Sequence, residues 1–478
     1  MVLRDIFEEL GRFDTAYSPA YYEDTDLCMS AQHAGYRVRY QPASRIIHHE
    51  GASHGTDASD TGSLKHHQVL NHETFLRKWH LQLAARRANG VEPELEKERD
   101  VAIRVLILDA RMLTPDQDSG SLRMLNMIRA FRQLGAKVTL APQNLIANEP
   151  YSSDLQRSGV EVIAEPHYRN IDDIINERGA EFDIVVLSRL EVAAEMLSLV
   201  RRHCVNASVV YDTVDLHFLR QIREHRLNGE VSGGFDHERT RELEIMCTQR
   251  ADVTFVCSTS EKSLLRDLVP DASIEVVGNI HEIAPTKTPV GDRRGMLFVG
   301  GFEHPPNLDA VEWFIAEVLP LVVAQIPNAL LHVIGSKVPP GLHALSGPHV
   351  RIHGFVPDLE PFYESVRIVV APLRFGAGVK GKVTQALSHG VPCIGTSVAF
   401  EGSGFLDGRD VIVADEPSAF AEACIALNAD DSQWQALRSD GLIALEKNFG
   451  LSRATERLAE ALSIVREPTA SSGTGTPQ

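Results

Sequence analysis

Short runs of Val, Ile and Leu alternate with longer amphipathic segments from residue 103 to about residue 448. Short apolar runs bounded by turn residues are typical of buried strands. The first half is therefore predicted to contain strands at Arg104–Asp109, Lys137–Ala141, Val160–Ala164, Asp183–Ser188, Ser208–Asp212, Val253–Ser258 and Ile274–Gly278. The second half is predicted to contain strands at Met296–Gly300, Leu330–Gly335, Val350–Phe355, Ile368–Leu373, Pro392–Thr396 and Val411–Ala414.

The segments between these runs show helical spacing, as where Leu125, Ile128 and Phe131 recur within Leu122–Leu134. Nearly continuous apolar strands separated by helices indicate parallel sheets covered on both faces. The pattern predicts an α/β protein with two doubly wound domains, residues 103–283 and 284–448. A ligand is then expected between them, at the carboxyl ends of the strands.

Four further segments lie outside this pattern. Residues 1–90 are rich in His and Tyr and are predicted to form a small α/β piece, followed by a charged linker at 91–102. A last helix within residues 449–466, at about Ser452–Val465, is expected to pack back across the domain junction. Residues 467–478 have the composition of a disordered tail.

Length and charge narrow the class of protein. A chain of 478 residues exceeds what one hydrophobic core can serve. The net charge of −18 argues against a nucleic-acid partner, which needs a basic surface. It leaves room for a phosphorylated small molecule, because a few local cations and backbone N–H groups suffice to bind one.

The sequence also bears on location. No run of eighteen apolar residues occurs, so no membrane span is expected. The six cysteines are scattered, which indicates reduced thiols. We therefore expect a cytoplasmic protein, and peripheral contact with the inner membrane is compatible with the sequence.

The loop at Arg374–Lys382 is the leading candidate for chemistry. It follows a predicted buried strand and precedes a helix, and it contains Gly376, Gly378, Lys380 and Lys382. Glycines let the backbone approach a ligand, and a helix N-terminus with two lysines can hold a diphosphate. The alternative is a glycine-rich turn whose lysines point to water.

Three more strand ends carry candidate residues. Asp118, Ser119, Gly120 and Ser121 lie where a helix should begin, and either ligand binding or helix capping explains them. Asp215 and His217 follow the strand Ser208–Asp212, where an Asp can serve a site or cap a helix. In Gly300–Asn307 the glycines, including Gly301, can approach a phosphate, while His304 and Asn307 can equally be ordinary turn residues.

The segment Arg374–Gly402 resembles the nucleotide-sugar signature of group 1 (family 4) glycosyltransferases. Other collinear stretches agree with this resemblance over about residues 103–466: RVLILD, TPDQDSGSLRMLNMIRAFRQLG, DIVVLSR, VVYDTVDLHFLR, FVGGFEHPPNLDAVEWF and VRIHGFVPDLEPFY. The resemblance implies the GT-B fold of two facing Rossmann-like domains. It also implies transfer of a sugar from a UDP-, GDP- or TDP-linked donor to a glycan or lipid-linked acceptor, with retention and without an obligatory metal or cofactor. The transferase modules of bacterial surface-polysaccharide assembly, including O-antigen and lipopolysaccharide synthesis, are most similar.

The resemblance also implies roles for single residues. Lys380 and Lys382 would neutralise the donor diphosphate, with Gly376, Gly378, Gly301, Gln385 and Glu401 completing the donor site. The loop at Asp118–Ser121 would lie near the leaving phosphate and the acceptor. Family members commonly carry two glutamates where this chain has Ala377 and Gln385. Val214 stands where a His is often found, so Asp215 or His217 is assigned the catalytic role.

Residues 1–90 resemble the carboxyl-terminal end of a group 2 (family 2) GT-A glycosyltransferase. The stretches YEDTDL, AGYR, HHEGAS and NHETFLRKW carry this resemblance. It implies a vestigial cluster of Glu23, Asp24 and His48, in a segment that lacks the nucleotide-binding half. We expect a catalytically silent remnant, with an upstream glycosyltransferase as a conceivable partner.

Three functions are consistent with the sequence. The first is an active retaining glycosyltransferase, and the second is a sugar-nucleotide epimerase or phosphorylase-like enzyme. The third is a non-catalytic GT-B scaffold that binds a partner enzyme through residues 1–90. The loss of both usual glutamates keeps this third alternative open.

Overall fold

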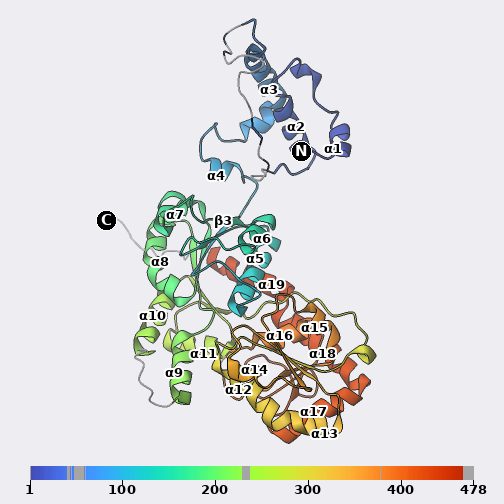
Figure 1. Cartoon of the computed structure of the whole chain (residues 1–478). Helices are drawn as coiled ribbons and strands as arrows, with labels where there is room; N and C mark the ends of the chain where they lie inside the picture. Colours follow the sequence, from blue (N-terminus) through green and yellow to red (C-terminus); the bar gives the residue numbers. More distant parts are fainter. Residues whose placement is uncertain are drawn as a thin grey trace, which may run out of the picture. The chain divides into compact units, whose positions relative to one another are not determined.

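The computed structural model describes residues 2–39, 44, 46–47, 57, 59, 61–228, 237–376 and 378–466. The chain divides into two compact units, Met1–Arg99 and Asp100–Gln478. The second unit contains two parallel sheets with helices packed against them (Figure 1). The predicted α/β class is thus confirmed for this unit.

The first sheet has seven parallel strands in the order β3-β2-β1-β4-β5-β6-β7. Its strands are β1 (Arg104–Asp109), β2 (Lys137–Pro142), β3 (Glu161–Val162), β4 (Ile184–Ser188), β5 (Ser208–Asp212), β6 (Val253–Val256) and β7 (Ile274–Val276). The helices of this domain are α5 (Ser119–Gln133), α6 (Tyr151–Arg157), α7 (Ile171–Arg178), α8 (Leu190–His203), α9 (His217–Asn228), α10 (His237–Arg250) and α11 (Thr259–Leu268).

The apolar residues of β1 serve two cores. Val105 and Ile107 pack with residues of α5, whereas Leu106 and Leu108 pack with residues of α7 and α8. Side chains alternate between the two faces of a strand, so a continuous apolar run buries both faces. This is why the run RVLILD contains no exposed position.

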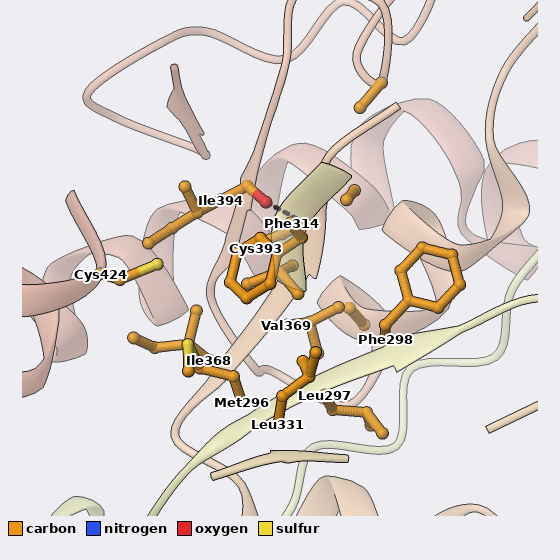
Figure 2. Close-up of a cluster of buried hydrophobic side chains, with 14 of the residues drawn as sticks. Met296, Leu297, Phe298, Phe314, Leu331, Ile368, Val369, Cys393, Ile394 and Cys424 are labelled. Atoms are coloured by element: carbon orange, nitrogen blue, oxygen red, sulfur yellow. Dashed lines mark hydrogen bonds between the residues drawn. The ribbon is translucent and has the colours of Figure 1, made fainter. Parts of the chain in front are cut away.

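The second sheet has six parallel strands in the order β10-β9-β8-β11-β12-β13. Its strands are β8 (Met296–Val299), β9 (Leu331–Ile334), β10 (Val350–Gly354), β11 (Ile368–Ala371), β12 (Cys393–Gly395) and β13 (Ile412–Val413). Its helices are α12 (Pro305–Trp313), α13 (Leu319–Gln325), α14 (Pro340–His343), α15 (Glu360–Ser365), α16 (Gly381–Ser388), α17 (Pro417–Ala429) and α18 (Asp431–Phe449). Figure 2 shows Phe298, Val369 and Ile394 of the strands meeting Phe314 and Cys424 of the helices in one core.

Every observed strand overlaps a predicted apolar run, although several strands are shorter than predicted. The run Val160–Ala164, for example, contributes only Glu161 and Val162 to the sheet. In both sheets the first strand lies inside the sheet and the order reverses beside it, between β1 and β4 and between β8 and β11. Loops that leave such a switch point in opposite directions make room for a ligand.

The last helix, α19 (Leu451–Arg466), packs on the first of these two domains, as expected. Ala454, Leu458 and Ala461 join the core that contains Val105, and the Thr455 hydroxyl donates to the Gln133 side chain at 2.9 Å. In Figure 1 α19 lies beside α5. The chain passes between the two domains twice, near His281 and near Gly450, and backbone hydrogen bonds join these two segments. His281 N donates to Phe449 O at 2.8 Å, and Leu451 N donates to His281 O at 3.0 Å.

The described part of Met1–Arg99 forms helices and no strand, whereas the sequence predicted an α/β piece. Its main helices are α1 (Arg4–Glu9), α2 (Glu23–His33), α3 (His67–Ala84) and α4 (Pro93–Glu96). A small core of Tyr17, Met29, Phe75 and Trp79 joins α2 and α3. At its centre the buried Asp26 accepts hydrogen bonds from the Tyr17 hydroxyl (2.9 Å), Trp79 Nε1 (2.7 Å) and Lys78 Nζ (2.9 Å).

The sequence also predicted reduced cysteines and no membrane span, and both predictions can be compared with the described residues. All six cysteines are free thiols. In the described ranges, no helix has the length and apolar character that a bilayer crossing requires. The tail at 467–478 lies outside the described residues.

Candidate functional site

The loop after β1 ends in a capped helix. The Asp118 carboxylate accepts hydrogen bonds from the backbone N–H groups of Gly120 (3.2 Å) and Ser121 (3.1 Å) and from the Ser121 hydroxyl (3.0 Å). Capping, one of the two interpretations of the sequence, thus accounts for Asp118 and Ser121. Ser119 is exposed on the first turn of α5, at the switch point of the first sheet.

The sequence did not single out Arg189, which joins this loop to two strands. Its guanidinium donates from Nε to Asp109 (3.1 Å), at the end of β1, and from Nη2 to Asp118 (2.9 Å). Arg189 N donates to Asp212 O at 2.8 Å, and the residue has φ +78°, a region that favours glycine. Backbone strain of this kind concentrates at functional sites.

Arg189 sets the charge state of its neighbours. Burial alone would raise the pKa of Asp118, but the guanidinium and the N–H donors of the capped turn outweigh it and hold the pKa below its usual value. For Asp109 burial is the stronger effect, so its pKa is raised in spite of Arg189. Asp118 is therefore a carboxylate at neutral pH, fixed between the guanidinium and the helix.

Gly120 is required by the crowding around it. A Cβ built on Gly120 would lie 3.1 Å from Val214 Cγ1 and 3.2 Å from Arg189 Nη2. Val214 itself has φ +61°, and its carbonyl accepts from the Cys257 thiol at 2.8 Å. Residues that follow β4 and β5 therefore crowd this glycine at the first turn of α5.

The two residues assigned a catalytic role are neighbours. His217 Nε2 lies 3.3 Å from the Asp215 carboxylate, which also pairs with Arg220 at 2.7 Å. Burial would raise the pKa of Asp215, but His217, Arg220 and Arg189 lower it below its usual value. Asp215 is thus ionised and oriented by a histidine and an arginine.

The backbone that carries His217 is held by Glu244, a second residue the sequence did not reveal. Its carboxylate accepts from His217 N (2.8 Å) and Phe218 N (3.3 Å) at the start of α9. Glu244 is fully buried, and burial raises its pKa to about 7. A buried carboxylate that satisfies two helix N–H groups is a positioning element rather than a ligand.

In the second domain the glycines after β8 and β9 pack against each other. A Cβ on Gly335 would lie 2.0 Å from Gly300 O, which no rearrangement of a side chain could relieve. A Cβ on Gly301 would lie 3.2 Å from Ser336 Oγ. The turn is closed by Asn307, whose Nδ2 donates to Gly301 O at 2.7 Å.

Lys382, in the first turn of α16, is half-buried. Its Nζ donates to Asn307 Oδ1 and lies 4.2 Å from the centre of the Phe298 ring. Burial, and next the charge of Lys380, lowers the pKa of Lys382 to about 7. Within the described ranges no carboxylate pairs with this ammonium group.

Lys380 is the N-cap of α16 and closes the loop before it. Its Nζ donates to Gly378 O at 2.6 Å. Gly376 and Gly378 have φ values of +146° and +69°, which glycine adopts without strain. Ala377, between them, lies outside the described residues.

The first turns of α5 and α16 face each other within Asp100–Gln478. A Cβ built on Gly381 would lie 3.3 Å from Ser119 Cβ, and Asn279 Nδ2 approaches Val379 O at 3.4 Å. Each helix N-terminus carries about half a positive charge. The structure thus brings two helix N-termini, Lys380 and Lys382 together, with Arg189 beside the α5 turn.

The remaining candidates lie at the margin of this arrangement. Gln385 is half-buried one turn into α16, and in the described structure its side-chain amide makes no hydrogen bond. Glu401 is exposed, and a Cβ on its neighbour Gly402 would lie 3.8 Å from both Ser258 and Val379. Their assignment to the donor stays a prediction.

The cluster proposed in residues 1–90 lies only partly within the described residues. Asp24 is exposed and accepts from its neighbour Thr25, at 2.7 Å from N and 3.2 Å from Oγ1. Glu23 Oε2 is buried and finds no hydrogen-bond partner in the described structure. His48 lies outside the described residues. The GT-A resemblance of this unit therefore stays a prediction.

Residues 293–430 match the sequence model of a family described as glycosyl transferases group 1. A curated protein from Klebsiella pneumoniae, described as an uncharacterized 44.6 kDa protein in the cps region, is 24% identical over 163 residues. The match covers 32% of this chain and only 42% of that protein.

Solved structures are similar over both α/β domains. Sucrose-phosphate synthase from Thermosynechococcus elongatus aligns with a TM-score of 0.56 and 15% identity, over 76% of this chain and 98% of that one. HepE from Anabaena, solved with UDP and glucose, aligns with a TM-score of 0.56 and 13% identity, over 76% and 99%. TarM aligns with a TM-score of 0.60 and 9% identity, over 76% and 99%.

At these identities the structures establish the fold, and they confirm the GT-B arrangement that the resemblance implied. The family match covers most of the second α/β domain, including the Arg374–Lys382 loop. The family match and the fold together support a glycosyltransferase.

Proposed function

We propose that this chain transfers a sugar from a nucleotide diphosphate donor to a glycan or lipid-linked acceptor in the synthesis of a bacterial surface polysaccharide. The surface-polysaccharide context is supported by the partial similarity to a protein of a cps region. A UDP-linked donor is supported by HepE, which was solved with UDP and with UDP-glucose. GDP- and TDP-linked donors are the alternatives that the test must include.

The observation that carries the proposal is the state of Lys382. Lys382 is half-buried and has no carboxylate partner among the described residues, so an anionic ligand would favour its charged form. Lys380 lies in the same loop, and the first turns of α5 and α16 lie next to each other. A diphosphate supplies the negative charge that this arrangement lacks.

The same groups suit the chemistry of transfer. Breaking the glycosidic bond leaves negative charge on the departing diphosphate, and fixed cations and N–H dipoles stabilise charge that develops in a transition state. In the proposal, Lys380, Lys382 and the α16 N-terminus do this without a metal. Asp215 and His217 would act on the acceptor side, and retention of configuration is carried over from the family resemblance.

The direct test measures release of nucleoside diphosphate from a panel of UDP-, GDP- and TDP-linked sugars, with and without lipid-linked acceptor. We expect release from one donor class that depends on the acceptor. Binding without turnover across the whole panel would instead favour the non-catalytic scaffold. Isomerisation of the donor sugar without transfer would favour an epimerase.

A second test addresses the two lysines proposed to bind the diphosphate. Replacing both Lys380 and Lys382 with Ala should weaken donor binding by at least about tenfold, because a hydrogen bond to a charged group contributes about 1.5–3 kcal/mol. Lys337→Ala is the matched control, since that lysine is exposed and pairs with Glu303. Unchanged affinity in the double variant would contradict the diphosphate role.

A further inference from the structure

Asn307 connects two parts of the second domain that are far apart in sequence. It lies in the first turn of α12 and is 9% exposed. Its Nδ2 donates to Gly301 O at 2.7 Å, in the turn after β8, and its Oδ1 accepts from Lys382 Nζ, in α16. The amide makes both bonds because its nitrogen is a donor and its oxygen is an acceptor.

The space around Asn307 leaves Lys382 little freedom. A Cβ on Gly300 would lie 2.9 Å from Asn307 Nδ2 and 2.9 Å from Lys382 Nζ. The Lys382 ammonium also lies over the Phe298 ring. The location of the Lys382 charge is therefore set by Asn307 and by the glycine turn that Asn307 closes.

The charged and titratable groups near Lys382 do not offer a carboxylate in place of the amide. Lys380 on the same loop repels its charge, while Cys393 of β12 has the opposite, weaker effect on the lysine pKa. Asp309 of α12 is engaged with Arg374. The neutral amide is thus the polar group that orients the half-buried ammonium.

We propose that Asn307 is a positioning residue for the donor diphosphate, holding the Lys382 ammonium against the glycine turn so that the turn and α16 bind the phosphates as one unit. This inference rests on the proposed function. Asn307 acts through Lys382 and Gly301 and need not touch the donor itself.

Because the Asn307 amide is neutral, the charge of Lys382 should change when a diphosphate binds, and this change can be measured as proton uptake. Because burial lowers the pKa of Lys382 to about 7, the lysine is mostly neutral at pH 8 in the empty site, and a bound diphosphate favours its charged form. Binding at pH 8 should therefore be accompanied by net proton uptake. The terminal phosphate of the ligand does not interfere, because its second pKa is about 6.

The experiment measures binding of UDP, GDP and TDP to the full chain at pH 8 by titration calorimetry. Buffers of different ionisation enthalpy report the proton uptake. Asn307→Ala should bind about tenfold more weakly, as expected for a lost hydrogen bond to a charged group. Asn307→Asp, which has the same size, places a carboxylate on Lys382, so it should bind at least about tenfold more weakly and lose the proton uptake.

Glu312→Gln is the control, because Glu312 is exposed on the same helix. It should bind and take up protons like the wild type, and thermal melting should show that Asn307→Asp is folded. If Asn307→Asp binds with unchanged affinity and unchanged proton uptake, the inference is wrong.

Two failures can be told apart. If the wild type binds none of the three diphosphates, the proposed function fails. If the wild type binds and Lys382→Ala binds weakly, while both Asn307 variants match the wild type, only the role of Asn307 fails.

Discussion

The guanidinium of Arg123 donates to both carboxylate oxygens of Asp212, each at 2.8 Å, and both side chains are buried. Arg123 Nε also reaches Val277 O (3.0 Å) and Gly278 O (3.1 Å). This pair fixes the second turn of α5 to the end of β5. The pair thereby fixes the position of the Asp118–Ser121 loop relative to the loop that contains Asp215.

Replacing Arg123 with Leu should lower the free energy of unfolding by about 3–5 kcal/mol, because Asp212 would be left buried without its counter-ion. Urea denaturation measures the change. In the control Arg129→Leu, the lost pair with Glu282 is solvent-exposed, so the change should stay within about 1 kcal/mol. Equal effects of the two substitutions would contradict this account.

Gly335→Ala should disrupt the glycine turn, because its Cβ has no space beside Gly300 O. We expect a loss of about 1–3 kcal/mol in unfolding free energy, together with weaker donor binding. Gly341→Ala is a suitable comparison, since nothing lies within 4 Å of its added Cβ. That helical substitution should be neutral or stabilising by up to about 1 kcal/mol.

Arg189→Lys should impair transfer although it preserves the charge. A lysine presents one ammonium group and cannot bridge Asp109 and Asp118 as the planar guanidinium does. We expect kcat/KM to fall by about tenfold or more, equivalent to about 1.4 kcal/mol or more. Arg201→Lys, at the exposed pair with Asp252, should leave kcat/KM within about twofold, since exposed pairs contribute little.

The raised pKa of Glu244 predicts a specific pH dependence of stability. A carboxyl group whose pKa is higher in the folded state stabilises the fold below its unfolded pKa, and this contribution is lost as the pH rises through the folded pKa. From pH 4.5 to above 7, the wild type should lose about 3 kcal/mol of stability relative to Glu244→Gln. Urea denaturation across this range tests it, with the exposed Glu238→Gln on the same helix as control.

Removing residues 1–99 should leave a chain that folds and binds the nucleoside diphosphate with unchanged affinity. Asp100–Gln478 is a compact unit with its own cores. Calorimetry on the shortened chain measures the affinity, and circular dichroism checks its folding. A loss of binding in a folded chain would show that the first unit contributes to the site.

The elements that local pattern determines were predictable from the sequence. Every strand overlaps an apolar run. The loops at Asp118 and Lys380 stand out because Asp, Ser and Gly in the first loop, and Gly and Lys in the second, follow a strand and precede a helix. Residues whose importance depends on distant partners were not predictable. Arg189 matters because β1 and β4 are neighbours, and Asn307 had the appearance of a turn residue until α16 placed Lys382 beside it.

Charge states were equally hidden in the sequence. Lys380 and Lys382 have the same chemical identity and differ by two positions, yet only the structure shows that Lys382 lies against Phe298 and Asn307. Glu244 and Glu238 lie on one helix, and burial separates a carboxyl group with a pKa near 7 from an exposed one. Such differences come from tertiary packing, which no spacing in the sequence encodes.

The return of α19 to the first of the two α/β domains means that this domain is assembled from discontinuous stretches of chain. Leu458 and its neighbours complete a core whose other members lie before residue 281. During synthesis that core can therefore close only after the residues of α19 have left the ribosome. The second α/β domain, by contrast, is an uninterrupted stretch of chain, so it can fold before α19 packs on the first domain.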